Sequence, residues 1–476
     1  MERYEITVEG GWLALELNGR SYFYDIENKR FVVLDNSLRK ALLEFRDLLE
    51  HGVFERVDDV VVPSFGGPAK LSSLTITAKC NMKCPYCFVY PVRQTCEMTP
   101  SVARNAVQSL RRQVEGHLTI YLWGGEPTLN PHALFAACSE GQKYEKTTLV
   151  LTTNGVFSDD ILKELLNFEN LHYQLSYDGR NAQNSQKLLI SGGKSLRSVE
   201  EKVYSIVHRG RGLNLRTTVT RDNLNELYDI FSSVVKLNAT LMVEHVHTSV
   251  GRSIRQKSKE PEVNDYSNAI LRLLSRAERS GILLVSAPFS ELRLGRPHRW
   301  AFANVLPDGQ VVATNAIVDS THPKFRFLRL GELSDNAICI DTDNVRRMAQ
   351  NLVRNAERHC AGCFAKPLCR GGAQRDAFSM SDNLQDLDMM RCRYYRTLLG
   401  LWLSALITAL KNDMEVRGFT EGVIRLDNCV GCKVRQPLLV HDKGLRFVWE
   451  GSQGEYRTFD QYLSSLSSLG PPPLNL

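Results

Sequence analysis

The sequence lacks any apolar run long enough to cross a bilayer. Its longest apolar stretch, residues 398–410, is too short for a membrane-spanning helix and is typical of a buried one. The N-terminus also lacks the basic start and the apolar run of a secretory signal. We therefore expect a soluble, cytoplasmic protein without membrane partners, and its length suggests about three domains.

Strong charge of one sign is also missing. The net charge is +6, and no run of Lys and Arg is interleaved with aromatic residues. We therefore expect no nucleic-acid partner. Cysteine, in contrast, is plentiful, because the 12 cysteines include several tight clusters. In a cytoplasmic protein such clusters indicate metal ligation rather than disulfide bonds.

Three of the cysteines, Cys80, Cys84 and Cys87, form the pattern CX3CX2C. Three thiolates can hold three irons of a [4Fe–4S] cluster and leave the fourth iron open to another ligand. In a helix these positions would share one face and could be small core residues. Pro85 disfavours helical geometry at Cys84, however, and favours a loop after a strand. A zinc site would need a second nearby cysteine pair, and none follows.

An aromatic residue, Tyr86, stands just before the last cysteine, and with it the pattern resembles the signature of the radical SAM superfamily. The resemblance implies that the open iron binds the amino and carboxylate groups of S-adenosylmethionine. It also implies one-electron reduction, with a flavodoxin- or ferredoxin-type partner as the reductant. This splits the cosubstrate into methionine and a 5′-deoxyadenosyl radical, which removes a hydrogen atom from the substrate.

From about residue 70 onward, strand-like and helix-like segments alternate as in parallel βα units. Six such units predict an α/β fold, a partial (β/α)6 TIM-like barrel over residues 70–290, with its chemistry where the strands end and the βα loops begin. The predicted strands are residues 74–77, 118–123, 147–152, 172–176, 213–219 and 240–245. The predicted helices include residues 101–114, 159–166, 198–208 and 223–235.

Polar or glycine-rich motifs follow three successive predicted strands. Each could be an ordinary turn, but their shared place at strand ends favours one site. Two glycines permit close backbone approach, and Glu126 adds an acceptor for a cationic group. By resemblance to the family, the GGEP motif lies against the methionine amino group, and Ser176 contacts the methionine carboxylate or the ribose. The cofactor-binding candidates are Gly124, Gly125, Glu126, Pro127, Asn154, Ser176 and Asp178.

Residues 1–65 predict a separate small domain. Short strands are expected at residues 4–8, 13–17, 22–25 and 31–33, followed by a helix at residues 37–49. The segment weakly resembles the small domain with which many peptide-modifying members of the family hold a precursor's leader. There the peptide would add a strand to a sheet edge. A lid or packing domain is the other interpretation.

Residues 303–314 predict a β-hairpin with Asp308 and Gly309 as its turn. Four thiolates follow, as a closed Fe–S or zinc site requires. Their spacing, with the Arg-Gly-Gly sequence after the third of them, resembles the SPASM domain over residues 295–395. That domain is a C-terminal extension of radical SAM enzymes that often modify peptides and proteins. The four candidate ligands are Cys360, Cys363, Cys369 and Cys392.

The chain departs from the SPASM pattern at two cysteines and has none just before the hairpin. Thr314 stands five residues after the hairpin glycine, and Ala373 stands four residues after Cys369, where the pattern has cysteine. The missing residues belong to the first auxiliary cluster, and the four that remain are the ligands of the second. We therefore expect one auxiliary [4Fe–4S] cluster, which accepts or relays an electron.

Residues 396–476 predict a C-terminal helix and extension, the helix covering residues 394–411. Cys429 and Cys432 could be a redox dithiol, half of a metal site, or a turn with two incidental thiols. His245 and His247 are expected to be structural. The sequence singles out no catalytic acid or base.

The preferred hypothesis is a radical SAM oxidoreductase of the peptide-maturase type, which crosslinks or oxidises a ribosomally made peptide or protein. The alternative is a radical SAM dehydrogenase or isomerase for a small polyol or amine. A third possibility is a non-catalytic Fe–S protein with a structural or sensory role. The open three-cysteine site opposes the third, because structural clusters are usually fully ligated.

Overall fold

The computed structural model describes the central part of the chain most completely. Described are residues 71–89, 96–114, 116–246, 252, 260–280, 282–286, 302–335, 337–359 and 392–397. The backbone of short strands is described as well, between residues 5 and 34 and between residues 422 and 457. The predicted helix at residues 37–49 lies outside these ranges, and of the predicted helix at 394–411 the structure describes only the first residues.

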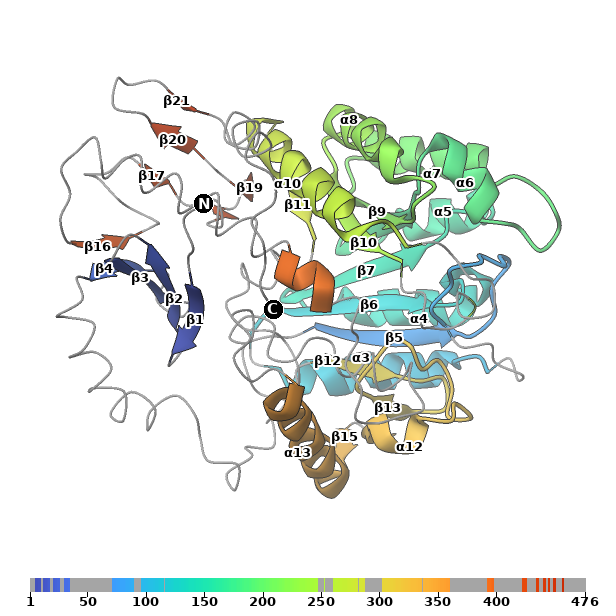
Figure 1. The fold of residues 1–476 in the computed structure, drawn as a ribbon. Coiled ribbons are helices and arrows are strands. Elements are labelled where there is room, and N and C mark those ends of the chain that lie inside the picture. The colour runs from blue at the N-terminus through green and yellow to red at the C-terminus, as the bar shows by residue number, and fades with distance from the viewer. Residues whose placement is uncertain are drawn as a thin grey trace.

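One continuous sheet of 11 strands organises the described core, in the order β11-β10-β9-β8-β7-β6-β5-β12-β13-β14-β15 (Figure 1). Strands β5 to β10 pair in parallel, which confirms the predicted partial barrel. Their bounds are Leu71–Thr77 (β5), Leu118–Gly124 (β6), Thr147–Thr153 (β7), Leu171–Ser176 (β8), Leu213–Val219 (β9) and Thr240–His245 (β10). A short strand, β11 (Leu284–Val285), extends the parallel part.

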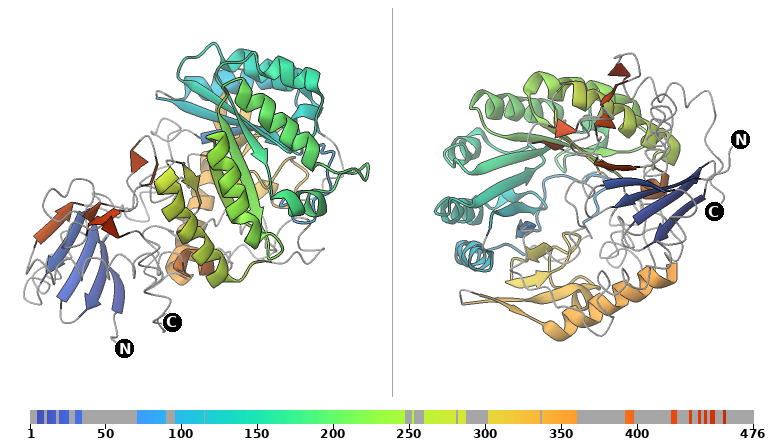
Figure 2. Two further views of the ribbon diagram at one scale, coloured as in Figure 1. Left: turned by 90° about the horizontal axis from the view of Figure 1, so that it is seen from above. Right: turned by 90° about the vertical axis from the view of Figure 1, so that its left-hand side faces the viewer.

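Helices cover the outer, convex face of this curved sheet (Figure 2). The first of them begins at Pro100, where the Thr99 hydroxyl accepts a hydrogen bond from the backbone of Val102 and so caps the helix. The helices are α3 (Pro100–Arg112), α4 (Pro131–Gly141), α5 (Asp159–Leu165), α6 (Arg180–Gln186), α7 (Leu196–His208), α8 (Leu227–Leu237) and α10 (Val263–Ser280). Two 3-10 turns, Pro127–Leu129 and Leu224–Glu226, precede α4 and α8.

Strand residues alternate between two environments. Outward-facing residues such as Leu122, Leu151 and Leu215 are fully or almost fully buried with the helices in one hydrophobic core. The alternate positions face the concave side and are largely polar, as with Gln174 and Arg216. The apolar core therefore lies outside the barrel, and its inner surface is free for a site.

A second group of strands joins the barrel directly. Strand β12 (Phe302–Val305) pairs in parallel with β5, and then β13 (Gln310–Val312), β14 (Arg329–Ser334) and β15 (Ala337–Ile340) follow in antiparallel order. The β12–β13 hairpin turns at Gly309, with φ of 83°, as its sequence predicted. Helices α12 (Phe325–Leu328) and α13 (Thr342–His359) belong to this region.

The N-terminal strands form a sheet of their own. Strands β1 (Glu5–Glu9), β2 (Trp12–Leu17), β3 (Arg20–Asp25) and β4 (Arg30–Leu34) make an antiparallel meander close to the predicted bounds, and β16 (Gly422–Arg425) pairs with β4. Five further short strands are Val434–Arg435 (β17), Val440–His441 (β18), Gly444–Leu445 (β19), Val448–Glu450 (β20) and Tyr456–Arg457 (β21). No described helix is long and apolar enough to span a membrane.

Candidate functional site

The three cysteines of the CX3CX2C pattern lie on the loop that leaves β5, at the carboxyl end of the parallel strands. As Pro85 predicted, this loop is not helical. The thiol of Cys80 accepts a hydrogen bond from the backbone N–H of Met82 at 3.4 Å. The backbone N–H of Cys87 donates to the carbonyl of Cys84 at 3.3 Å. The loop therefore has a defined conformation with its thiols on one short turn.

The chemistry of these thiols fits an iron–sulfur cluster. Burial raises the pKa of Cys80 to about 12 and that of Cys84 to about 11, so the protein alone does not stabilise the thiolates. Among the described residues, no three His, Cys, Asp or Glu side chains converge as the ligands of one metal ion would. In a [4Fe–4S] cluster each thiolate binds its own iron, so this convergence is not required. Iron would displace the thiol protons on binding.

Two glycines at the carboxyl end of β6 let the loop that follows pack closely against the cysteine loop. A Cβ on Gly124 would lie 2.1 Å from the carbonyl oxygen of Thr77, and one on Gly125 would lie 2.1 Å from that of Lys79. Backbone hydrogen bonds tie the two loops together, from Gly125 to Thr77 at 2.9 Å and from Glu126 to Lys79 at 2.8 Å. Only glycine permits this approach.

Glu126 is fully buried, and its carboxylate serves the protein itself. It accepts hydrogen bonds from the hydroxyls of Thr128 and Thr153, both at 2.7 Å, and from the backbone N–H of Asn154 at 2.7 Å. Burial raises the pKa of Glu126, and these hydrogen bonds oppose the rise. The side chain thus fastens the loops after β6 and β7 to each other. Pro127, also buried, begins the 3-10 turn that follows.

Asn154 connects this pair of loops to the cysteines. Its amide nitrogen donates to the side-chain oxygen of Asn81 at 2.7 Å and lies 4.0 Å from the sulfur of Cys80. Asn81 in turn donates to the carbonyl of Val156 at 2.7 Å. The structure therefore brings Asn154 next to the cysteine loop, where an N–H donor can interact with a cluster ligand.

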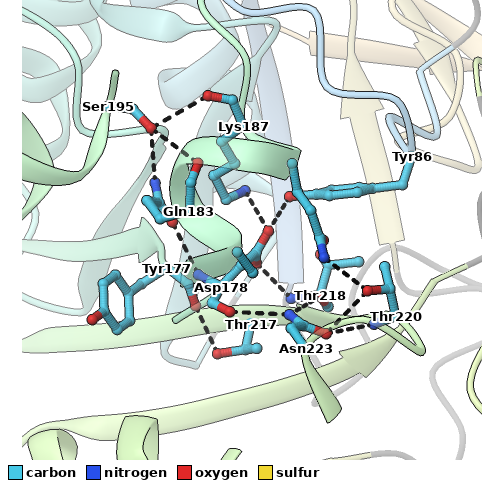
Figure 3. A network of polar contacts seen from close by, with 12 residues as sticks. Tyr86, Tyr177, Asp178, Gln183, Lys187, Ser195, Thr217, Thr218, Thr220 and Asn223 are labelled. Carbon is cyan, nitrogen blue, oxygen red and sulfur yellow. Dashed lines mark hydrogen bonds and ion pairs between the residues drawn. The ribbon is translucent and has the colours of Figure 1, made fainter. Parts of the chain in front are cut away.

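Asp178, two residues after the end of β8, is the centre of a second buried network (Figure 3). Its carboxylate accepts a hydrogen bond from the Tyr86 hydroxyl and one from the backbone N–H of Thr218 at 3.0 Å. The ammonium of Lys187 lies 3.6 Å from the same carboxylate and 5.3 Å from the centre of the Tyr86 ring. Burial raises the pKa of Tyr86 well above its usual value, and the charge of Asp178 adds to the rise. The aromatic residue of the cysteine pattern is thereby anchored to the barrel.

Ser176 ends β8 on the concave side, and the structure adds a residue that the sequence analysis missed. Arg216 is its Cα partner on β9, and the buried Nε of Arg216 has no hydrogen-bond partner in the described region. Burial raises the pKa of Tyr121 on β6, and the charge of Arg216 opposes this rise. Arg216 occupies a polar, concave-facing position of β9, and a charged residue in the middle of a barrel strand was the available signal.

The second set of cysteines is described only in part. Cys392 lies half-buried on a helical segment, residues 392–397. Cys360, Cys363 and Cys369, together with Ala373, Cys429, Cys432 and His247, lie outside the described residues. His245 is buried against Tyr266 and Tyr394, with ring centroids 5.9 and 4.2 Å away, which agrees with a structural role.

The neutral side-chain amide of Asn304 on β12 fixes the β12–β13 hairpin to the barrel. Thr314 is buried there, and Asn304 donates to the carbonyls of Thr314 and Ile317 at 3.4 and 3.1 Å. The oxygen of Asn304 accepts from the hydroxyls of Ser73 and Thr75, at 2.7 and 3.1 Å, and from the indole N–H of Trp123, at 3.2 Å. This side chain joins β5, β6 and the segment after β13.

Comparison with known proteins agrees with this geometry. The family model of the radical SAM superfamily matches residues 74–258, which contain the cysteine loop and strands β6 to β10. The PqqA peptide cyclase of Methylorubrum extorquens (strain PA1) is 26% identical over 340 residues, covering 67% of this chain and 84% of that protein. The GTP 3′,8-cyclase of Helicobacter pylori is 25% identical over 213 residues, covering 43% of this chain and 65% of that protein.

Two solved structures have the same fold. One is "native anSMEcpe with bound AdoMet and Cp18Cys peptide", with a TM-score of 0.56 and 20% identity, covering 73% of this chain and 100% of that one. The other is Streptococcus suis SuiB bound to the precursor peptide SuiA, with a TM-score of 0.53 and 12% identity, covering 82% of this chain and 100% of that one. With the cysteine loop and the partial barrel inside the matched range, residues 74–258 form a domain that matches the radical SAM superfamily.

Proposed function

We propose that this protein is a radical SAM peptide maturase, which removes a hydrogen atom from a peptide or protein substrate and so starts a crosslink or an oxidation. One observation carries the substrate class. The similarity to the PqqA peptide cyclase extends over 67% of the chain and therefore beyond the barrel, into the region of the hairpin. The GTP 3′,8-cyclase, which acts on a nucleotide, is similar over only 43%.

The cysteine loop is the proposed seat of the catalytic cluster, with Cys80, Cys84 and Cys87 as ligands. A [4Fe–4S] cluster at this place supplies an open iron and the electron that splits S-adenosylmethionine. The chain's own residues hold and shape the site. Glu126 fixes the loops after β6 and β7, and Asn154 donates toward Cys80.

The concave face provides the groups that would hold the methionine part of the cosubstrate. The close-packed backbone at Gly124 and Gly125 offers carbonyl acceptors for the amino group. Ser176 and Arg216 lie side by side on β8 and β9, where a hydroxyl and a guanidinium together suit a carboxylate. Asp178, whose carboxylate is occupied by Tyr86, Lys187 and Thr218, acts by positioning the cysteine loop.

We also propose one auxiliary [4Fe–4S] cluster, with Cys360, Cys363, Cys369 and Cys392 as ligands, in a domain of residues 295–395. Its role is electron transfer or structure, because four thiolates leave no iron open to the substrate. Two clusters imply about eight irons per chain. Iron and sulfide analysis of the wild type beside a Cys429→Ala/Cys432→Ala variant tests this count. About twelve irons falling to eight would mean a third cluster.

Replacing Cys80, Cys84 and Cys87 together by Ala tests the catalytic assignment. Reductive cleavage of S-adenosylmethionine, measured as 5′-deoxyadenosine after anaerobic reconstitution, should be abolished. Iron bound by the auxiliary cysteines should remain. Cleavage that persists in this variant would exclude the proposed site.

Deleting residues 1–65 tests the peptide substrate. The N-terminal sheet presents a strand edge at β1, which is paired only with β2 among the described strands, and an extended leader could add there. With peptides encoded by neighbouring genes as substrates, we expect the deletion to stop product formation and to spare 5′-deoxyadenosine formation. Unchanged product, measured by mass spectrometry, would favour the small-molecule alternative. A cytoplasmic location and a flavodoxin- or ferredoxin-type reductant complete the proposal.

A further inference from the structure

The loop between α6 and α7 lies against the cysteine loop, and at its exposed side it carries apolar and basic residues. The two loops lie at the same end of the barrel, at the right of Figure 1, where the cysteine loop is blue and the other is green. The backbone N–H of Lys83 donates to the carbonyl of Leu188 at 2.8 Å, and that of Ile190 donates to Asn81 at 3.0 Å. An isolated bridge pairs Met82 with Leu189.

Side chains fix both ends of this α6–α7 loop. Lys187, at its start, is buried against Asp178 and the Tyr86 ring. The hydroxyl of Ser195, at its end, lies 3.3 Å from the carbonyl of Lys187 and 3.3 Å from that of Gln183 (Figure 3). Anything that binds to the loop is therefore held at a fixed place beside Cys84.

The outward side of the loop is apolar at its centre. Leu188 is 37% exposed and Ile190 is 60% exposed, the second being among the most exposed large apolar side chains in the described region. Large apolar side chains exposed together beside a functional loop indicate a contact surface rather than chance exposure.

The charged side chains of the two loops are of one sign. Residues 79–89 and 187–195 contain four lysines and no acidic residue. Lys187 is paired with Asp178 and Lys79 with Glu97, which leaves two exposed lysines on these segments. Lys83 bonds through its backbone to Leu188, and Lys194 follows Ile190 by four residues in the same loop. We call Lys83, Leu188, Ile190 and Lys194 the cluster-side patch.

We propose that the cluster-side patch is the docking surface for an acidic one-electron carrier protein. The proposal rests on the proposed function, since it assumes a cluster on Cys80, Cys84 and Cys87. In each turnover one electron leaves the reduced carrier, enters the cluster and is consumed in breaking a C–S bond of S-adenosylmethionine. No atom passes between the proteins, so the carrier needs only a surface close to the cluster. An apolar centre with a basic rim suits a partner with an apolar contact and acidic surroundings.

Two variants test the patch, Ile190→Glu in its centre and Lys194→Glu at its rim. The reconstituted full-length enzyme is supplied with S-adenosylmethionine and increasing amounts of an acidic flavodoxin kept reduced by its NADPH-dependent reductase, and 5′-deoxyadenosine is measured. For each variant we expect the flavodoxin concentration for half-maximal rate to rise about tenfold, as for the loss of one important interface contact. Added salt should slow the wild type and slow Lys194→Glu less.

Two controls make the result specific. Val235→Glu on α8 changes an exposed apolar residue, 37% exposed, by the same charge away from the cysteine loop, and it should behave as the wild type. With dithionite in place of flavodoxin, all variants should form 5′-deoxyadenosine at the wild-type rate. A wild type that fails with dithionite would refute the proposed function rather than the patch.

Three outcomes would overturn the proposal of the patch. The first is an unchanged flavodoxin dependence in Ile190→Glu and Lys194→Glu. The second is an equal loss with dithionite, since the loop would then act on the cluster and not on the carrier. The third is weaker peptide binding with an unchanged flavodoxin dependence, which would assign the patch to the substrate.

Discussion

Two buried polar networks fasten other segments to the barrel, and they differ in charge. The Asp178 network holds the cysteine loop with a carboxylate, an ammonium and a phenol. The Asn304 network holds the segment after β13 with one neutral amide, two hydroxyls and an indole. Burying an ion costs much desolvation free energy, and removing its partner causes a large loss of stability. For neutral groups both the desolvation cost and the loss of stability are smaller.

The difference follows the demands on each segment. The cysteine loop must hold thiols whose pKa values burial has raised, next to a cofactor, and a strong clamp resists its displacement. The segment after β13 packs where strands are already held together by backbone hydrogen bonds, since β12 pairs with β5. A neutral amide is sufficient there.

Removing the charged centre should have the largest effect. Asp178→Ala leaves Lys187 buried without its counter-charge and Tyr86 without its acceptor, so we expect a loss of about 3–5 kcal/mol in the free energy of unfolding. Denaturant unfolding under anaerobic conditions measures this loss, and iron analysis should show poorer loading of the cysteine loop. The double variant Asp178→Asn/Lys187→Met removes both charges and should lose far less. Equal losses would mean that charge is not what distinguishes this network.

Removing the neutral centre should cost less. Asn304→Ala leaves three donors and two carbonyls without their partner, for which we expect about 1–3 kcal/mol. Hydrogen exchange should speed up in β12 and β13 but not at the cysteine loop. Asn181→Ala, at an exposed position on α6, serves as control and should stay within about 0.5 kcal/mol. If Asn304→Ala lost as much free energy of unfolding as Asp178→Ala, the charged and the neutral network would not differ in strength.

A single hydroxyl in the charged network should matter still less. Tyr86→Phe removes the donor to Asp178 and keeps the ring beside Lys187, so we expect a loss of about 1 kcal/mol in unfolding. The cleavage of S-adenosylmethionine should continue at a reduced rate. Tyr204→Phe, at an exposed tyrosine, is the control. If Tyr86→Phe is indistinguishable from it in both measurements, the hydroxyl is not part of the clamp.

Acid should destabilise the hairpin side through one buried histidine. Burial lowers the pKa of His322, in the segment after β13, to about 4, although the charge of Asp319 opposes this. The unfolded chain then binds the proton more tightly between about pH 6.5 and pH 4, so this group makes stability fall as the pH falls through that range. At pH 5.5 the contribution is about 1 kcal/mol relative to neutral pH. His322→Gln should show a shallower pH dependence of unfolding, and an unchanged slope would contradict the assignment.

The sequence predicted what depends on local pattern. The six barrel strands were found within a few residues, because alternation and flanking turns are local properties, and the hairpin turn followed from Asp308 and Gly309. The contacts of Asp178 and Glu126 were not predictable in this way. Tyr86 meets Asp178 across 92 residues of chain, and no local rule pairs them. Glu126 was expected to accept from a cationic group, and only the fold shows that Thr128, Thr153 and Asn154 occupy it.

The pairing of β12 with β5 has a consequence for how the protein is made. Ser73 and its partner Asn304 are 231 residues apart, so the strand that leads into the cysteine loop has one exposed edge until residue 305 has left the ribosome. At ordinary rates of translation this interval is roughly 10–50 s. Within it the cysteine loop is already synthesised but is bounded on one side only. Until the hairpin docks, the open edge of β5 can pair wrongly with another strand, so this interval is when the chain is most exposed to misfolding.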